Sequence, residues 1–156
     1  MEPPSTHSIT VLNPGDYPIA SSRIEAGVYA ALAMQGAAPS DVRVLLTDDA
    51  EIQRLNLRFR KQDESTDVLT FPDGEAASGD IAISTAYAER QAKARGIQTA
   101  DEIVFLAIHG ALHLAGLNDE TEPERAEMTH RMHQVGAELG MPDESDWSSL
   151  LHEVGS

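Results

Sequence analysis

Four short apolar stretches of the chain have the length and composition of β-strands, and the first alternates between apolar and polar residues. Turn-forming residues follow the first stretch at 13–16 and the third at 72–74. Because the last two stretches follow closely on one another, we expect them to pair in antiparallel orientation. The predicted strands cover residues 7–12, 42–46, 68–71 and 81–83.

Five further segments carry apolar residues at helical spacing and predict α-helices between and after the strands. At the start of three of these helices, a Ser or Thr precedes a Glu by three positions, which is the pattern of a capping box. The second helix begins at a cap formed by residues 47–49, and Ser84 caps the third. In the second helix we expect Ile52, Leu55 and Phe59 to face inward. The predicted capping boxes are Ser22 with Glu25, Thr99 with Glu102 and Thr121 with Glu124.

The helix predicted from Thr99 to Ala115 is apolar almost all the way round, which is typical of a helix in the centre of a fold. Gly116 is placed to end it in the left-handed conformation. The order of the elements predicts an α+β fold, close to α/β, in which helices pack on a small mixed four-stranded sheet. Residues 1–142 are expected to form a single domain, followed by a polar tail over residues 143–156.

The amino-acid composition narrows the chemistry that the chain can perform. None of its 156 residues is a cysteine, which excludes disulfides, iron–sulfur clusters, thiolate zinc sites and a cysteine nucleophile. The first residues lack the basic and apolar regions of a signal peptide, and no apolar run approaches the ~20 residues of a membrane span. We therefore expect a soluble cytoplasmic protein with no membrane partner.

Charge is distributed unevenly along the chain. The net charge is -15, which by itself argues against non-specific binding to phosphate groups. However, seven of the 11 basic residues lie in two short segments, 54–61 and 90–95. A basic groove on an acidic body would suit RNA, whereas two ordinary solvated helix faces would account for the same pattern.

Two histidines lie in the most apolar predicted helix. His109 and His113 are four residues apart, so both imidazoles project from the same helix face and can reach one metal ion. Asp119 follows the helix-ending Gly116 and could fold back to supply a third ligand. Three protein ligands with a fourth position for water are the arrangement of a catalytic zinc site. The alternative is a pair of packed, hydrogen-bonded core histidines, and the spacing alone leaves both interpretations open.

Sequence motifs surround the two histidines and recur earlier in the chain. The motifs are HGALHLAG at residues 109–116, LNLRFR at 55–60, TDVLTF at 66–71 and GDI at 79–81. In this order and spacing they resemble the YbeY family of single-strand-specific metallo-endoribonucleases, which act in ribosomal RNA maturation. The resemblance extends from about residue 42 to residue 140 and covers most of the predicted domain.

The resemblance implies a metallohydrolase domain in which one zinc or other divalent ion is held by His109, His113 and Asp119. Asp119 departs from the family pattern, which most often has His there, but a carboxylate is also a sound zinc ligand. A water activated by the metal would hydrolyse the phosphodiester bond. Arg60 would bind the scissile phosphate and stabilise the developing charge, which makes it both a substrate-binding and a catalytic residue. Without the resemblance, Arg60 would be an ordinary arginine at a helix end.

The same resemblance implies single-stranded RNA as the substrate. It points to maturation of the 3′ end of 16S ribosomal RNA and to ribosome quality control, with the ribosome or its proteins as partners. A metallopeptidase-like hydrolase on the same scaffold is an alternative, but peptidases of the HExxH pattern have a glutamate general base where this chain has Gly110. A non-catalytic, ribosome-associated module with a structural metal is the second alternative.

Overall fold

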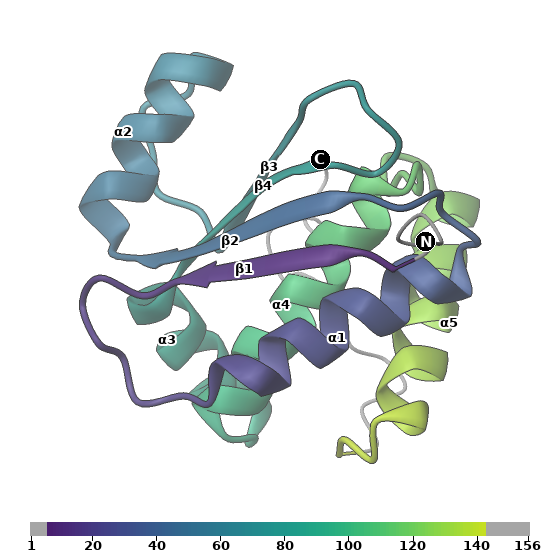
Figure 1. Cartoon of the computed structure of the whole chain (residues 1–156). Coiled ribbons are helices and arrows are strands. Elements are labelled where there is room, and N and C mark those ends of the chain that lie inside the picture. The colour runs from purple at the N-terminus through teal and green to yellow at the C-terminus, as the bar shows by residue number, and fades with distance from the viewer. Residues whose placement is uncertain (1–5, 143–156) are drawn as a thin grey trace.

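A single sheet is the frame on which the other elements are placed. The computed structural model describes residues 6–142, so the predicted tail over 143–156 lies outside the described residues. The strands are β1 (Ser8–Leu12), β2 (Asp41–Thr47), β3 (Val68–Pro72) and β4 (Gly79–Ser84). They lie in the order β1-β2-β4-β3, with β3 antiparallel to β4 and the other neighbours parallel (Figure 1). The predicted α+β fold with a small mixed four-stranded sheet and an antiparallel pair is confirmed.

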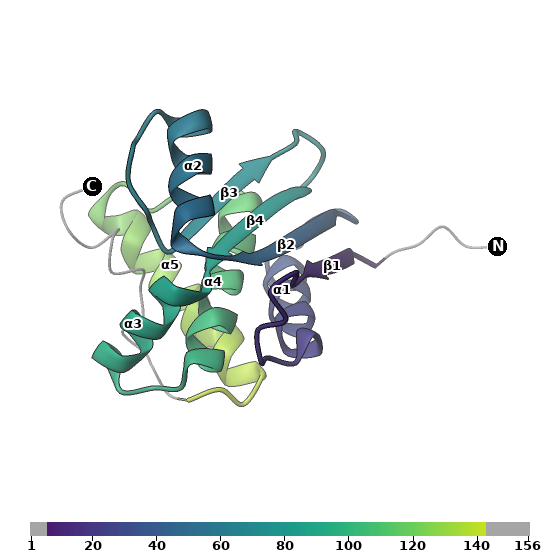
Figure 2. The same cartoon turned by 90° about the vertical axis from the view of Figure 1, so that its left-hand side faces the viewer.

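Helices cover the two faces of the sheet unequally. The helices of the described residues are α1 (Ser21–Met34), α2 (Asp49–Arg60), α3 (Thr85–Arg95), α4 (Thr99–Leu114) and α5 (Glu122–Glu138). Figures 1 and 2 show α2 alone on one side of the sheet and the other helices on the opposite side. None of the helices within residues 6–142 has the length and apolar character needed to cross a membrane.

The helix α4 lies at the centre of the larger helical layer, as its all-round apolar sequence predicts. Every residue from Glu102 to Leu112 is buried. This helix packs against α1, α5 and the sheet, and Phe105, Leu106 and Ile108 belong to the main core. A Cβ atom on Gly27 of α1 would lie 3.1 Å from Cγ1 of Ile108, so the glycine permits the close approach of the two helices. Packing on all sides therefore fixes the position of α4.

Of the three predicted capping boxes, that of the last helix is confirmed and that of the first is wrong. Thr121 caps α5, and the side chains and backbone N–H groups of Thr121 and Glu124 bond reciprocally. In α1 the N-cap is Ala20, and no side chain caps this end. Ser22 already lies within the first turn, so its hydroxyl is past the position from which it could cap the N–H of Glu25.

The capping box predicted at Thr99 is also wrong, because its glutamate is used elsewhere. Gln98 is the N-cap of α4, and its side chain makes no capping bond. The Glu102 side chain is fully buried, where its carboxylate accepts a hydrogen bond from Gln91 at 3.0 Å and pairs with Arg95 at 3.2 Å. Burial of a charged group without such partners costs on the order of several kcal/mol. Glu102 therefore joins α4 to α3 through a buried contact and does not cap its own helix.

The inward face predicted for α2 is only partly confirmed. Ile52 is fully buried with Leu69 and Ala82 in a small cluster on this side of the sheet, and Leu55 packs against the cluster. The prediction that Phe59 faces inward is wrong, since 56% of this residue is exposed. Phe59 lies in the last turn of α2, where its ring meets that of Phe71 on β3 edge to face but more than half of the residue stays exposed.

Asp49, the first residue of α2, connects several segments of the chain. Its carboxylate accepts hydrogen bonds from Ser65 at 3.1 Å and Ser84 at 2.6 Å, and it pairs with Arg90 at 2.9 Å. Burial alone would raise the pKa of Asp49, but these three contacts together outweigh it and hold the pKa below its ordinary value. The contacts tie α2 to the segment before β3, to the end of β4 and to α3.

The contacts of Asp49 predict a pH-dependent contribution to stability. Because folding lowers this pKa, the contribution is complete above the ordinary pKa of the carboxyl group and is lost as the pH falls through the lower folded-state value. We expect Asp49→Asn to lower the free energy of unfolding by about 1 kcal/mol at neutral pH, a figure reduced because the side chain is 35% exposed.

Urea unfolding at neutral and at acid pH measures the contribution of Asp49. The difference between Asp49→Asn and the parent chain should shrink on acidification, and a difference independent of pH contradicts the account. Glu138→Gln is the control, because it removes an exposed carboxylate that has no ion pair among the residues described.

Candidate metal centre

Two histidine rings from the C-terminal half of α4 face one another. His109 is 1% exposed, while the side chain of His113, one turn later, is 19% exposed. Their Nε2 atoms lie 3.0 Å apart, and the two ring planes are inclined by 80°. Both imidazoles leave the same face of the helix and reach the same place, as the four-residue spacing predicts.

Asp119 returns to the two rings from the loop that follows α4. Gly116 has a φ of +104°, the left-handed backbone that commonly ends a helix, and the chain reverses there. The reversal brings Oδ2 of Asp119 to 3.4 Å from Nε2 of His109 and to 3.3 Å from Nε2 of His113. The structure thus brings together the three side chains that the sequence predicts as ligands.

The three donor atoms fit the ligand sphere of a divalent ion. Imidazole nitrogens and carboxylate oxygens are both ligands that zinc accepts, and at bond lengths of ~2.1 Å tetrahedral ligands lie about 3.4 Å from one another. The observed separations of 3.0, 3.3 and 3.4 Å are close to that value. The two distances from histidine to aspartate are also longer than ordinary hydrogen bonds. His109, His113 and Asp119 can therefore hold a metal ion.

Hydrogen bonds at the start of α5 hold the loop that carries Asp119. The Glu124 carboxylate accepts from the N–H groups of Glu120 at 3.2 Å and Thr121 at 2.9 Å. Arg125 donates to the carbonyl oxygen of Glu120 at 3.0 Å. The backbone N–H of Thr121 is the largest of the influences that lower the pKa of Glu124, which favours its charged form. The confirmed capping box therefore helps to place the third candidate ligand.

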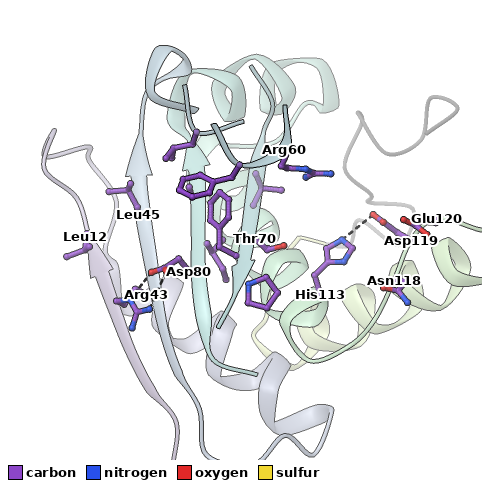
Figure 3. A pocket seen from close by; sticks show the side chains of 17 residues that line it. Leu12, Arg43, Leu45, Arg60, Thr70, Asp80, His113, Asn118, Asp119 and Glu120 are labelled. Atoms are coloured by element: carbon purple, nitrogen blue, oxygen red, sulfur yellow. Dashed lines mark hydrogen bonds and ion pairs between the residues drawn. The ribbon is translucent and has the colours of Figure 1, made fainter. Parts of the chain in front are cut away.

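A groove of about 980 Å³ runs from this group of side chains across the side of the sheet that α2 partly covers. Figure 3 shows His113, Asp119 and Arg60 toward one end of the groove, and Leu12 and Asp80 toward the other. Since the groove passes directly beside two of the candidate ligands, an extended substrate could lie along it.

The two basic segments of the sequence have different surroundings. Arg60, the last residue of α2, lines the groove at the end where His113 lies. In the second segment, over residues 90–95, Arg90 and Arg95 form ion pairs with carboxylates outside the groove lining. Of the two basic segments, the first therefore supplies a cation, Arg60, to the groove lining, and the second supplies none.

Gly110, which follows His109, restricts the chemistry of the site. A Cβ atom at this position would lie 2.9 Å from Cγ2 of Ile81 and 3.2 Å from Cγ2 of Thr70. Glycine therefore lets α4 pack directly against β3 and β4. A glutamate general base, such as the HExxH peptidases carry at this position, has no room here unless the helix moves.

The groove also contains side chains that the sequence analysis did not assign to the site. Phe59 and Phe71 line it, as do Arg43 and Asp80, which form an ion pair at 2.7 Å. The sequence does hold one sign that Phe59 belongs to the site, because it lies beside Arg60 in a basic run. Its helical spacing instead favoured burial in the core. No local signal identifies the pair of Arg43 and Asp80, because it depends on β2 and β4 being neighbours in the sheet.

The family model and the curated relatives that match this chain carry the same description. The family described as Endoribonuclease YbeY matches residues 18–140. An Endoribonuclease YbeY of Roseiflexus sp. (strain RS-1) is 38% identical over 153 residues, which cover 89% of this chain and 96% of that protein. Another, from Solibacter usitatus (strain Ellin6076), is 45% identical over 105 residues, which cover 67% of this chain and 69% of that protein. The solution structure of TM1509 from Thermotoga maritima matches with a TM-score of 0.59 and 27% identity, covering 91% of this chain and 97% of that one.

Proposed function

Because this chain belongs to the endoribonuclease YbeY family, we propose that it hydrolyses phosphodiester bonds in single-stranded RNA and that it depends on a bound metal ion. The observation that carries this proposal is the convergence of His109, His113 and Asp119 beside a groove that Arg60 also lines. Residues 1–142 would act as one metallohydrolase domain.

The ion that we propose is a single Zn²⁺, although another divalent metal would suit the same ligands. The proposed substrate is ribosomal RNA, in maturation of the 3′ end of 16S ribosomal RNA and in ribosome quality control. The proposed partners are accordingly the ribosome or its proteins, and the proposed location is the cytoplasm. Family membership supports these finer assignments.

His109, His113 and Asp119 would hold the ion through two neutral nitrogens and one charged oxygen. A divalent ion bound there acidifies a coordinated water and polarises a phosphoryl oxygen. The burial of His109 in α4 fixes the direction of one ligand, and the loop before α5 fixes that of Asp119. Rigid ligands of this kind would hold a bound ion in a constant position relative to the groove.

Arg60 would hold the RNA phosphate beside these ligands. Its guanidinium can donate two parallel hydrogen bonds to phosphate oxygens. Among residues 6–142 no carboxylate forms an ion pair with it, so its charge is available to a substrate. Negative charge grows on the phosphoryl oxygens as water attacks, and the same guanidinium would stabilise that charge.

A cleavage assay with matched substrates tests the proposed function. Single-stranded RNA, the same sequence as a duplex, and casein are each incubated with the protein, with and without a chelator. The proposal predicts metal-dependent cleavage of the single-stranded RNA and intact casein. Chelator-sensitive hydrolysis of casein with intact RNA would instead favour the peptidase.

In the same assay, we expect Arg60→Ala to slow RNA cleavage by about 100-fold, because one charge contact to the transition state is lost. The metal content of the variant should equal that of the parent chain. Arg54→Ala is the matched control, since Arg54 lies on the same helix but pairs with Glu51. Unchanged cleavage kinetics for Arg60→Ala would show that Arg60 neither binds the phosphate nor stabilises the developing charge.

Two alternatives are less well supported. A peptidase of the HExxH type would need a glutamate at Gly110, where Ile81 and Thr70 leave no space for one. A structural metal would be enclosed by four protein ligands, whereas within residues 6–142 three candidate ligands converge and two of them line a groove. The first observation disfavours the peptidase, and the second favours a catalytic over a structural metal.

A further inference from the structure

The last turn of α2 and its cap expose an unusual combination of side chains. Residues 58–61 are Arg, Phe, Arg and Lys, and all four are exposed. Within residues 6–142, none of the three cations forms an ion pair with a carboxylate. By contrast, Arg54, earlier on the same helix, is held by Glu51. The charge at the end of α2 is therefore uncompensated locally, although the chain as a whole is strongly acidic.

An aromatic side chain lies in the middle of this basic run. Phe59 is 56% exposed, and its ring meets that of Phe71 edge to face, with 5.3 Å between the centroids and 62° between the planes. The guanidinium of Arg58 lies 5.2 Å from the centre of the Phe59 ring. Phe59 and Phe71 both line the groove that contains His113. An exposed ring supported by a second ring and flanked by cations is the chemistry of a site for single-stranded nucleic acid.

We propose that Phe59, supported by Phe71, stacks against one unpaired base of the RNA, next to the phosphate that Arg60 holds. This inference rests on the proposed function, and it adds a base-binding position to the groove. Arg58 and Lys61 would contact phosphates on either side of the stacked nucleotide. Because every base has a π face, the site accepts any base, and it requires that base to be unpaired.

The proposed position explains a preference for single strands without any base-specific contact. A base in a duplex is stacked between its neighbours and cannot present its face to Phe59. The other occupant that a partly apolar groove would accept is the apolar side chain of a peptide. The unpaired cations at residues 58–61 favour the polyanion, since they would meet its phosphates.

The test measures binding separately from cleavage. Fluorescence anisotropy follows the full-length protein with a single-stranded, cleavage-resistant 2′-O-methyl phosphorothioate oligonucleotide. We expect Phe59→Ala to weaken binding about tenfold and Phe59→Trp to restore it. Leu57→Ala is the matched control, because Leu57 is 49% exposed on the same helix but lies outside the groove lining. Unchanged binding by Phe59→Ala, or an equal loss in Leu57→Ala, would overturn the proposal.

A series of oligonucleotides with one abasic position each identifies the contact. At one position, removal of the base should weaken binding to the parent chain about tenfold but leave binding to Phe59→Ala unchanged. Equal losses in both proteins at every position would contradict the stacking. If binding follows this pattern but no RNA is cut, the proposed function fails while the inference stands; if RNA is cut and Phe59→Ala binds normally, only the inference fails.

Discussion

Replacement of His113 by alanine is expected to reduce RNA cleavage by at least about 100-fold, because one of three candidate metal ligands is lost. The Nε2 atom of His113 lies 3.0 Å from that of His109 and 3.3 Å from Oδ2 of Asp119, so no neighbouring ligand can take its place without movement. The fold should persist, since the His113 side chain is 19% exposed and its truncation leaves no enclosed cavity.

The measurement is the cleavage rate on single-stranded RNA together with circular dichroism. His130→Ala is the control, because His130 is an exposed histidine on α5. His113→Ala should be folded and inactive, and His130→Ala folded and active. Full cleavage activity in the His113→Ala variant would contradict a mechanism in which His113 binds the metal ion.

Replacement of Gly110 is expected to lower the stability of the fold. A Cβ atom there would lie 2.9 Å from Ile81 and 3.2 Å from Thr70, both in strands on which α4 packs directly. For Gly110→Ala we expect the free energy of unfolding to fall by about 1–3 kcal/mol, since overpacking a core outweighs the helix propensity gained. For Gly110→Glu the loss should be larger, because a buried charge is added.

Denaturant unfolding measures both variants, and Gly15→Ala is the control. Gly15 has open space around it and no left-handed backbone, so the added methyl group meets nothing. A Gly110→Ala protein as stable as the parent would show that α4 can move away from the sheet. In that event, the argument from space against a glutamate at this position would fall.

Local geometry explains why the metal group could be predicted from the sequence. A helix fixes the direction of residues four apart, so the convergence of His109 and His113 follows once the helix is recognised. The return of Asp119 depends on the reversal at Gly116 and on the capping box at Thr121, both of which have short-range signals. The apolar residues all round α4 likewise predicted its position at the centre of the fold.

Features that depend on distant parts of the chain could not be predicted. The contact of Arg43 with Asp80 requires the strand order, which no local pattern encodes. Glu102 follows Thr99 as in a capping box, yet Arg95 from the preceding helix attracts it into the core. Phe59 has helical spacing for burial, but at the end of α2 it meets Phe71 of β3 edge to face and stays 56% exposed. In each case the outcome depends on tertiary structure that the local sequence does not encode.

The central claim is that His109, His113 and Asp119 bind one metal ion, and its most direct test is anomalous X-ray diffraction at the zinc edge from crystals equilibrated with zinc. The account predicts one strong peak about 2.1 Å from Nε2 of both histidines and from Oδ2 of Asp119. A peak elsewhere, or none at these three atoms, would contradict it.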